Sequence, residues 1–490
     1  MARKEAIINW KMLIRVIGWL LLIEAVFMVF PLVLTIIFNE SYMPFVVSIA
    51  LTLFAGVIAT TCVRPKRFDM GKREGFLLTG MVWVVFSFFG MIPFMLCRSP
   101  LNVSDAFFEA MSGFTTTGAT TMLDTTVISH GIHLWRALMQ WIGGMGIILF
   151  TLAVLPMLNS SGGMQMFNAE VTGITHEKLR PRVSATAKRL WLIYFLLTLT
   201  LGVLYWFGPM DWFDSLCHAL STMSTGGFST RADSLLAWDC RYVKVVTTVF
   251  MFIGGVNFSL IYRASVGQFR AVWHNDVFKI YVWVIIALFI VFDISLFLNN
   301  NVPNTVDNLT IDPLFQIVST LSSTGYTVAN FDQWGTFLLG IVIIMMFVGA
   351  CAGSTAGGAK LDRVVLLWKN TRNELYRCIY PNHILSVNVN RTTISPEIVN
   401  KVMVFLALYI GIIIVGGALL TICGASLGDA YFSAFSCVSN SGLDAAISHN
   451  GGAYAQISDS GKWVLSMLML TGRLEIFTIL IILTPRFWHK

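Results

Sequence analysis

The chain has 490 residues, of which 56% are hydrophobic and only 12% are charged, and its net charge is +7. The charged share is about half that of an ordinary globular protein, so the chain has too few charges to cover a soluble surface. This composition favours an integral membrane protein over a soluble enzyme, a disordered chain or a secreted disulfide scaffold. The 8 cysteines include no CxxC pair, which indicates neither a zinc site nor a redox motif.

Long apolar runs recur from one end of the chain to the other. A helix needs about 20 residues to cross a bilayer. Ten runs come to about this length: 13–38, 42–63, 76–97, 134–158, 190–208, 243–262, 280–299, 335–358, 402–422 and 463–485. The first run is too long for a cleaved signal peptide, and no small-residue cleavage site follows it. We therefore predict an all-α membrane protein with ten transmembrane helices.

Basic residues predict the orientation of these spans. Of the 33 Lys and Arg, 26 lie in six segments on one side of the predicted membrane: 1–15, 64–73, 178–189, 263–279, 360–401 and 486–490. Cytoplasmic loops carry an excess of Lys and Arg in multispanning proteins. We therefore expect both termini to be cytoplasmic, in a multi-pass protein of the plasma membrane.

Four segments between the spans share one pattern. They read DAFFEAMSGFTTTGA from Asp105, DSLCHALSTMSTGGF from Asp214, DPLFQIVSTLSSTGY from Asp312 and DAYFSAFSCVSNSGL from Asp429. Each has a Ser seven residues after the Asp, a Thr or Ser ten residues after it, and a Gly thirteen residues after it. Four matches at fixed offsets indicate an internal repeat.

Each shared segment lies between two predicted spans, so the repeating unit is a helix, a re-entrant segment and a second helix. Two spans return the chain to its starting side, so all four units point the same way around an axis along the membrane normal. We place two N-terminal helices in 1–73. The four pore repeats then occupy 74–189, 190–278, 279–399 and 400–490.

The re-entrant segments suit a pore. The Asp at each start is a good N-cap, and the roughly ten apolar residues after it are too few to span the bilayer. Irregular backbone at membrane depth survives only where it lines protein or a water-filled cavity. Four half-helices would aim their partially negative carbonyl ends at one centre, where rings of carbonyls can replace the hydration shell of a cation. The alternative is that the Ser and Gly residues serve only to pack the half-helices.

The four blocks TTTGA, STGGF, SSTGY and SNSGL, each after a D-x6-S half-helix, resemble the Trk/Ktr/HKT superfamily of potassium transporters. The likeness covers nearly the whole chain, and the two extra N-terminal spans are similar to the TrkH/TrkG branch. The resemblance implies a pseudo-fourfold potassium pore, a homodimer and a cytosolic ring of TrkA-like nucleotide-binding subunits. It also implies the bacterial inner membrane, with potassium as the substrate and no cofactor in this chain.

The resemblance also assigns a selectivity filter. Its glycines carry over to Gly118, Gly227, Gly325 and Gly442, and the residues just before them are Thr117, Gly226, Thr324 and Ser441. Each block keeps one shared Gly, whereas the TVGYG filter of tetrameric channels has two, so we expect fewer ion sites and looser exclusion of sodium. Because all four repeats retain this Gly, we expect potassium to be preferred and rubidium to pass.

A Gly-rich stretch interrupts the second helix of the third repeat. It reads GACAGSTAGGAK and contains Gly349, Gly353, Gly357, Gly358 and Lys360. The glycine spacing fits close helix packing, but four Gly in twelve residues make a poor helix interior, so unwound backbone is favoured. The superfamily carries a Gly-rich intramembrane loop at this place that acts as a gate, and the resemblance implies that role here. The stretch contains no GxxxxGK[ST] phosphate-binding loop.

Arg473 lies in the middle of the last predicted span. A charge at this depth is costly and usually faces a pore or a partner. Glu475 is two residues away and does not face Arg473 on a helix, although a pair with that or another acid is the alternative. The superfamily has a matching Arg in the pore below the filter, so we assign Arg473 to the gate as a barrier to cations.

Other polar residues and functions carry less weight. Glu24 and Asp293 lie inside spans and His218 lies in the second half-helix, and we assign none of them a transport role. The main alternative function is a symporter that couples potassium to protons or sodium, as in Ktr systems. An enzyme ranks last, because the sequence has no nucleophile–base pair or nucleotide loop. The basic loops 178–189 and 360–401 are candidate docking surfaces for the ring, membrane lipid surrounds the spans, and no nucleic acid is expected.

Overall fold

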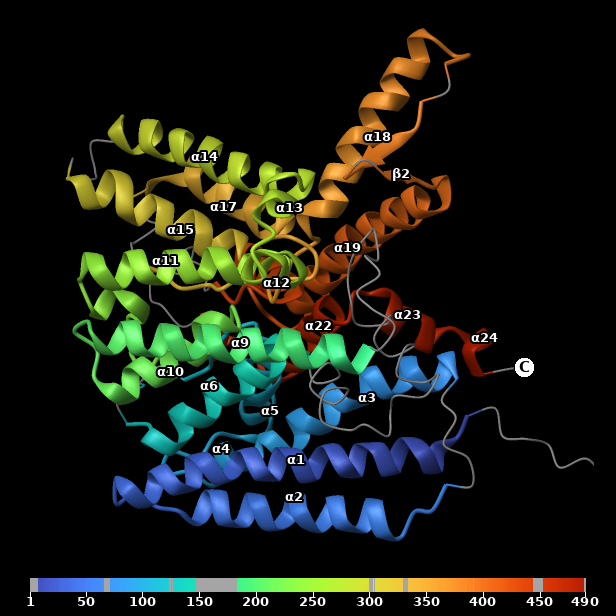
Figure 1. Ribbon diagram of the computed structural model, residues 1–490. Coiled ribbons are helices and arrows are strands. Elements are labelled where there is room, and N and C mark those ends of the chain that lie inside the picture. The colour runs from blue at the N-terminus through green and yellow to red at the C-terminus, as the bar shows by residue number, and fades with distance from the viewer. Residues whose placement is uncertain are drawn as a thin grey trace, which may run out of the picture.

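Helices that run side by side in stacked layers make up the molecule (Figure 1). The computed structural model describes residues 8–65, 71–122, 125, 127–146, 183–298, 303, 305–328, 334–383, 385–390, 392–443 and 453–488. Large apolar side chains such as Val26, Phe54 and Trp283 are more than half exposed on the outer helices. An outer surface of this kind suits contact with lipid.

Two N-terminal helices form one side of the bundle. α1 spans Trp10–Ile37 and α2 spans Met43–Thr61. They pack closely because Gly18 and Gly56 face each other, and a Cβ on either would lie 3.1 Å from the other's carbonyl oxygen. Small residues at a crossing let two membrane helices approach in this way.

Four repeats follow, each with a first helix, a half-helix and a second helix. The first helices are α3 Lys72–Gly90 (continued by α4 Ile92–Leu96), α9 Val183–Trp206, α14 Asp276–Phe297 and α19 Pro396–Ile422. The half-helices are α5 Val103–Phe114, α10 Trp212–Met223, α15 Asp312–Leu321 and α20 Leu427–Val438. The second helices are α6 His130–Gly144, α11 Arg241–Gly255, α17 Thr336–Val348 and α22 Asp459–Arg473. The predicted repeating unit therefore occurs four times.

The repeats join in a ring. The second helix of each repeat contacts the half-helix of the next one: α6 with α10, α11 with α15, α17 with α20, and α22 with α5. The last of these contacts brings repeat 4 back to repeat 1. The four half-helices consequently lie inside the bundle, where most of their side chains are buried.

Two of the second helices are broken, contrary to the predicted single spans 243–262 and 463–485. α11 is followed by α12 Phe258–Ser265 at 107°, and α22 by α23 Phe477–Leu483 at 114°. After α11, two glycines weaken the helix, and Asn257 starts α12 by accepting a hydrogen bond from the N–H of Ser259. After α22, Glu475 and Ile476 take positive φ angles of 55° and 54°, which turn the chain out of the helix.

Six described helices are long and apolar enough to cross a membrane, or eight if each bent pair counts as one span. Of the two other predicted spans, 134–158 contains α6 and then continues outside the described residues, and 335–358 contains only α17 as helix. A helical, multispanning architecture is thus confirmed, and the number ten remains a prediction.

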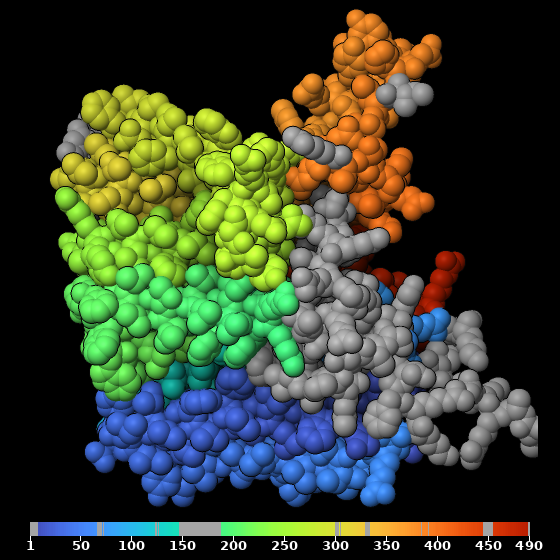
Figure 2. Space-filling model, in the orientation of Figure 1, coloured from blue at the N-terminus to red at the C-terminus, as the bar shows by residue number. Residues whose placement is uncertain are grey.

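One feature projects from the bundle, namely α18 Leu361–Ile379 (Figures 1 and 2). An antiparallel hairpin follows it, with β1 Val387–Val389 paired to β2 Thr392–Ile394 in the register Asn388 to Thr393. The remaining short elements are η2 Ser234–Ala237, α13 Phe269–Trp273, η3 Asp307–Ile311, α21 Ala453–Gln456 and α24 Pro485–Trp488. The indole rings of Trp10 and Trp488 stack with centroids 6.4 Å apart, so the start of α1 and the end of α24 lie on the same side.

Candidate ion-conducting site

Three of the four half-helices have their N-cap three residues earlier than predicted. The N-cap residues of α5, α10 and α20 are Asn102, Asp211 and Ser426, and each side chain accepts a hydrogen bond from the N–H of the repeat's Asp three residues later. The predicted N-cap role of Asp105, Asp214 and Asp429 is therefore wrong, as it is for Asp312, where Ile311 is the N-cap. These acids sit in the first turn instead, where a negative charge is favourable.

All four half-helices end in the same loop. The second residue after each helix takes a positive φ of 50–55°: Thr116, Thr225, Ser323 and Asn440. The next N–H bonds back to the carbonyl of the shared Ser, as Thr117 does to Ser112 at 2.9 Å and Thr324 to Ser319 at 2.9 Å. This left-handed cap ends each helix and turns the chain sharply. The shared Thr or Ser and the shared Gly flank that turn.

The shared Ser then fixes the segment that follows the filter Gly. In repeats 1, 3 and 4 its hydroxyl donates to the carbonyl seven residues later, as in Ser112 to Ala119 at 2.6 Å and Ser436 to Leu443 at 3.1 Å. In repeat 2, Ser221 donates instead to Oε1 of Gln140 at 2.7 Å. The fixed offsets in the sequence therefore record one hydrogen-bonded loop, with a single exception.

The eight predicted filter residues meet in a closed ring. A Cβ on Gly118 would overlap the carbonyl oxygen of Gly226, and likewise Gly227 adjoins Thr324, Gly325 adjoins Ser441, and Gly442 adjoins Thr117. These four glycines have φ between 61° and 83°, a region that costs other residues energy. Each glycine is thus required twice, by its backbone angle and by the carbonyl beside it. Four carbonyls, one from each repeat, line the junctions of the ring.

A buried ion pair supports the ring from behind. Glu109 of α5 and Arg136 of α6 are 2.8 Å apart and almost fully buried. Glu109 also accepts hydrogen bonds from the hydroxyl of Thr120 and the N–H of Thr121, just after the repeat 1 filter. The Arg136 guanidinium lies 4.1 Å from the ring centroid of Phe228, just after the repeat 2 filter. The pair therefore ties together two neighbouring corners.

His218 occupies the position in repeat 2 that Glu109 occupies in repeat 1. Its ring nitrogens lie 2.8 Å from the carbonyl of Asp214 and 3.0 Å from the hydroxyl of Ser229. His218 is therefore held by hydrogen bonds within its own repeat.

The Gly-rich stretch 349–360 is an irregular buried loop between α17 and α18. Gly349, Gly353 and Gly358 have φ of 64°, 75° and 76°, and Lys360 has 73°. The predicted unwinding is confirmed. Hydrogen bonds to the end of α11 satisfy some of the backbone groups of the loop. The N–H of Cys351, for example, donates to the carbonyl of Gly255 at 3.1 Å.

The same loop lies directly against the ends of the half-helices. The N–H of Gly358 donates to the carbonyl of Ser439 at 2.9 Å, and the N–H of Gly357 donates to the hydroxyl of Ser323 at 2.5 Å. Thr225 donates to the hydroxyl of Thr355 at 3.2 Å. Three filter loops, in repeats 2, 3 and 4, therefore touch the stretch. A Cβ on Gly357 would overlap the Ser439 carbonyl.

Arg473 joins three repeats. From the end of α22 its guanidinium donates to the carbonyl of Thr355 in the loop at 3.1 Å, and to the carbonyls of Gly143 and Gly144 at 2.6 and 3.2 Å. Glu475 pairs instead with Arg363, so Arg473 points away from it as expected. The Lys360 ammonium group is buried and donates to the carbonyl of Ala356 within the loop.

The two intramembrane acids differ. Glu24 is fully buried in α1, and neither of its carboxylate oxygens has a hydrogen-bond partner among the described residues. Its Oε1 would lie 3.3 Å from a Cβ on Gly90, so the carboxyl group faces α3. Asp293 is only partly buried, near the end of α14.

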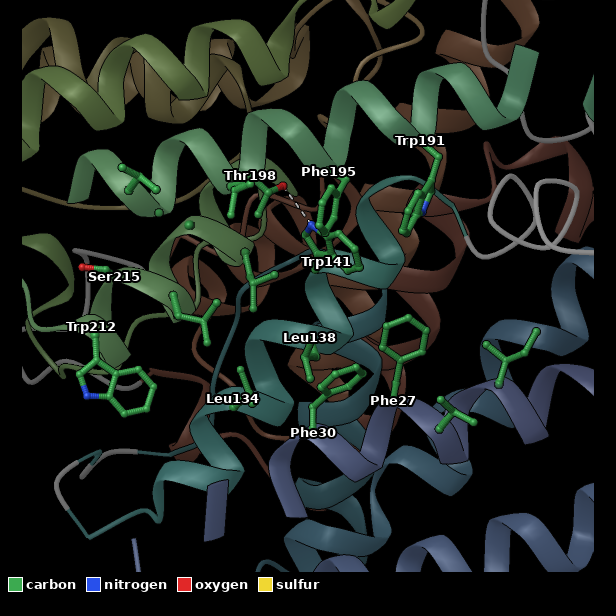
Figure 3. Close-up of a pocket in the computed structure, with 18 of the residues that line it drawn as sticks. Phe27, Phe30, Leu134, Leu138, Trp141, Trp191, Phe195, Thr198, Trp212 and Ser215 are labelled. Carbon is green, nitrogen blue, oxygen red and sulfur yellow. Dashed lines mark hydrogen bonds between the residues drawn. The ribbon is translucent and has the colours of Figure 1, made fainter. Parts of the chain in front are cut away.

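A mostly apolar groove of about 1070 Å³ lies between α1, α6, α9 and α10. Figure 3 shows Phe27, Phe30 and Leu138 on one side of it and Trp191 and Phe195 on another. Trp141 in its wall donates to the hydroxyl of Thr198 at 3.0 Å. The groove thus reaches both the second helix of repeat 1 and the half-helix of repeat 2.

Known proteins resemble the chain over its whole length. Residues 43–279 and 277–490 match the family described as TrkH, cation transport protein. The Trk system potassium uptake protein TrkH of Salmonella typhimurium is 33% identical over 98% of this chain and 100% of its own, and TrkH of Vibrio parahaemolyticus is 34% identical with the same coverage. The crystal structure of the potassium transporter TrkH from Vibrio parahaemolyticus superposes with a TM-score of 0.88 at 32% identity, covering 98% of this chain and 100% of that one.

The chain belongs to the TrkH family of cation transport proteins. The family predicted from the four blocks is therefore confirmed, and the relatives are transport proteins, not enzymes.

In this member of the TrkH family, sequence reasoning missed the residues behind the filter. Glu109, Arg136 and Gln140 are buried, and their side chains bond to backbone groups of the ring or of the segments just after it. Two signals were present in the sequence: a polar residue four positions after the Asp in every block, and a second Gly, Gly226, where the other blocks have Thr or Ser.

Proposed function

We propose that this chain takes up potassium ions across the bacterial inner membrane through a channel-like pore. The observation that carries the proposal is the closed ring in which each filter glycine adjoins a carbonyl of the next repeat. A ring of backbone carbonyls replaces the hydration shell of a cation. The proposed filter residues are Thr117, Gly118, Gly226, Gly227, Thr324, Gly325, Ser441 and Gly442.

The proposed gate is the loop 349–360 together with Arg473. The loop fills the space against three filter loops, and Arg473 fastens it to repeat 1 through the carbonyls of Thr355, Gly143 and Gly144. Two basic side chains, the buried Lys360 and the partly buried Arg473, would oppose the passage of a cation. Opening requires these bonds to exchange for others.

Control of this gate comes from a cytosolic TrkA-like ring that binds nucleotides, and the chain works as a homodimer. In support, α18 follows the loop directly, because Lys360 is its N-cap residue. The helix projects from the bundle and exposes Trp368 and Ile379 (Figure 1), so a partner that holds α18 can pull on the loop. Most of the other proposed docking segment, 178–189, lies outside the described residues.

Both termini are proposed to be cytoplasmic, with the repeats bounded at 74, 190, 279 and 400. The stacked Trp10 and Trp488 support a common side for the two ends. Membrane lipid is a further proposed partner, since an acyl chain suits a groove lined almost entirely by apolar groups and walled by Leu138 and Phe195 (Figure 3). Narrowing the groove with Leu138→Trp should reduce the lipid that co-purifies with the protein, measured by mass spectrometry.

The test is cation flux into proteoliposomes that hold the chain alone. We expect rubidium to move down its gradient with no pH or sodium gradient, faster than sodium, and we expect Gly325→Ser to lose this preference. If neither cation moves, the TrkA-like ring is added, because a closed gate gives the same result. Equal fluxes of rubidium and sodium through the wild type, with or without the ring, would contradict the proposal.

A symporter coupled to protons is the second candidate. Glu24 favours it, because a fully buried carboxyl group without a hydrogen-bond partner is unusual inside a membrane. Flux that requires a pH gradient, and that loses this requirement in Glu24→Gln, would decide for symport.

A further inference from the structure

Gln140 contacts one corner of the filter ring directly. Its Nε2 donates to the carbonyl of Gly226 at 2.6 Å, and the side chain is fully buried. Its Oε1 accepts from the hydroxyl of Ser221 at 2.7 Å and from the N–H of Phe228 at 3.2 Å. A backbone N–H can only donate, so the amide oxygen must face Phe228 and the amide nitrogen must face the carbonyl.

This contact makes the corner of repeat 2 unlike the others. In the described part of the chain, no hydrogen bond reaches the equivalent carbonyls of Thr117, Thr324 or Ser441. A donated hydrogen bond fixes the direction of a carbonyl and uses one of its two lone pairs. The Gly226 carbonyl is therefore held in place and offers a weaker field to an ion.

Gln140 also explains why repeat 2 has two glycines. A Cβ on Gly226 would overlap the amide group of Gln140. The backbone does not demand glycine there, since Gly226 is absent from the residues with positive φ. The space that a Thr or Ser side chain takes in the other repeats is thus given to a side chain of repeat 1.

Two other repeats have methionine where repeat 1 has Gln140. A Cβ on Gly143 would overlap the carbonyl of Phe114, and one on Gly472 would overlap that of Val438, the same position of the two half-helices. Gln140 and Met469 each lie three residues before these glycines. In repeat 2, Gly254 faces the carbonyl of Met223, and the residue three positions before Gly254 is Met251. Met469 and Met251 lie in the second helices of repeats 4 and 2. In the repeat that follows each of them, the residue before the filter Gly is a threonine, Thr117 and Thr324 respectively.

We propose that Gln140 is a positioning residue for selectivity, which holds the Gly226 carbonyl back from the pore axis so that this corner cannot close around sodium. The inference rests on the proposed function of the ring as a potassium filter. A carbonyl that is free to move toward the axis can follow a smaller ion, whereas a held carbonyl favours the larger one.

The test is rubidium and sodium flux into proteoliposomes for the wild type and variants of the full chain, with the TrkA-like ring added wherever the wild type requires it. Gln140→Met should raise sodium flux and lower the rubidium-to-sodium ratio roughly threefold to tenfold, the size expected for one hydrogen bond. Gly226→Thr alone should lose flux of both cations, because Gln140 fills the space. The double variant Gln140→Met with Gly226→Thr copies two of the other corners and should regain flux of both cations, but its rubidium-to-sodium ratio should stay as low as in Gln140→Met, because the carbonyl at this corner still lacks a hydrogen-bond donor.

Tyr205→Phe is the matched control. It removes a buried hydroxyl that bonds Thr222 of the same half-helix and Thr247, but it touches no filter carbonyl, so the ratio should not change. Ser221→Ala serves as a milder variant if Gln140→Met does not fold, because it removes one of the two donors that orient the amide. It should lower the ratio in the same direction.

Three results would overturn the inference: an unchanged ratio in Gln140→Met, an equal fall in Tyr205→Phe, or a wild-type ratio in the double variant. Gly227→Ala in the same assay separates this from failure of the filter itself. If Gly227→Ala changes selectivity and Gln140→Met does not, only the role of Gln140 fails. If neither variant changes it, the ring is not the filter.

Discussion

The filter ring and the layer directly beneath it are built on opposite plans. In the ring, four repeats supply the same loop, with the same positive φ before the Gly and the same backbone bond to the shared Ser. In the layer beneath, each repeat supplies something different. Repeat 3 gives the loop 349–360, repeat 4 gives Arg473, and repeat 1 gives the carbonyls of Gly143 and Gly144.

The difference follows from what each layer must do. Coordination of an ion on one axis needs similar ligands from all sides, so the four loops remain alike. A gate needs one segment that can adopt two conformations. Four identical segments would leave no single one to move. Under the proposed function, the chain keeps its repeats similar where they bind an ion and different where they control its passage.

The sharpest way to break the comparison is to damage one of the four equivalent corners. Gly442→Ala adds a methyl group that would overlap the Thr117 carbonyl, at a φ of 61°. We expect rubidium flux to fall to background. Gly424→Ala is the control, since Gly424 has a φ of 96° but open space around it, so it carries the cost of the backbone angle alone. Near-normal flux in Gly442→Ala would show that the ring tolerates distortion.

The support behind the ring predicts the largest loss of stability. Arg136→Met leaves Glu109 buried without its charge partner, which costs about 3–5 kcal/mol for a broken buried pair. The midpoint of thermal unfolding in detergent should fall accordingly. Adding Glu109→Met removes the unpaired charge as well and should restore much of the loss. A single variant as stable as the wild type would mean that water reaches the pair.

The layer beneath the filter predicts a change in gating. Arg473→Gln removes charged hydrogen bonds to Thr355 and to Gly143, each worth about 1.5–3 kcal/mol. Loss of at least one of these hydrogen bonds destabilises the closed state relative to the open one. Rubidium flux without the regulatory partner should therefore rise roughly tenfold or more. Arg473→Lys keeps the charge but not the planar fork. A leak in both variants identifies the hydrogen bonds as the closing force, and a leak in Arg473→Gln alone identifies the charge.

The two layers also differ in how far the sequence predicts them. The ring could be predicted because its residues recur at fixed offsets, and repetition shows a pattern within a single sequence. The contacts of Arg473 and Gln140 join residues of different repeats, and neither contact is repeated. Such pairings depend on the way the repeats close around the axis. The bends after α11 and α22 were missed for a related reason, because the apolar residues on both sides of each bend read as one continuous span.

The start of each half-helix illustrates a local limit of the same kind. A shared Asp suggested an N-cap, but the capping residue varies between Asn102, Asp211 and Ser426. All three can accept the same hydrogen bond, so the conserved function is carried by different residue types. The pattern therefore predicted the first turn of the half-helix correctly but assigned the N-cap to the wrong residue.

The ion pairs at the boundaries between repeats give the smallest predicted effect on stability. They also distinguish two boundaries of the ring from the other two. Lys244 is the fourth residue of α11 in repeat 2, and it pairs with Asp312 of repeat 3 at 2.8 Å. Lys462 is the fourth residue of α22 in repeat 4, and it pairs with Asp105 of repeat 1. The other two boundaries have His133 and Leu339 at this position. Two junctions out of four are therefore held by charge.

Lys244→Met should cost about 1 kcal/mol, between the values for a surface pair and a fully buried pair. This pair lies close to the surface, because Lys244 is also 3.4 Å from the exposed Asp239. The comparison variant is Arg241→Met, which removes an exposed pair to Asp307 across the same boundary. The Arg241 guanidinium lowers the pKa of Asp307, but exposure leaves the pair little influence on stability. Thermal unfolding should separate the two variants, and an equal effect would mean that the boundary is held by helix packing and not by the buried Lys244–Asp312 pair.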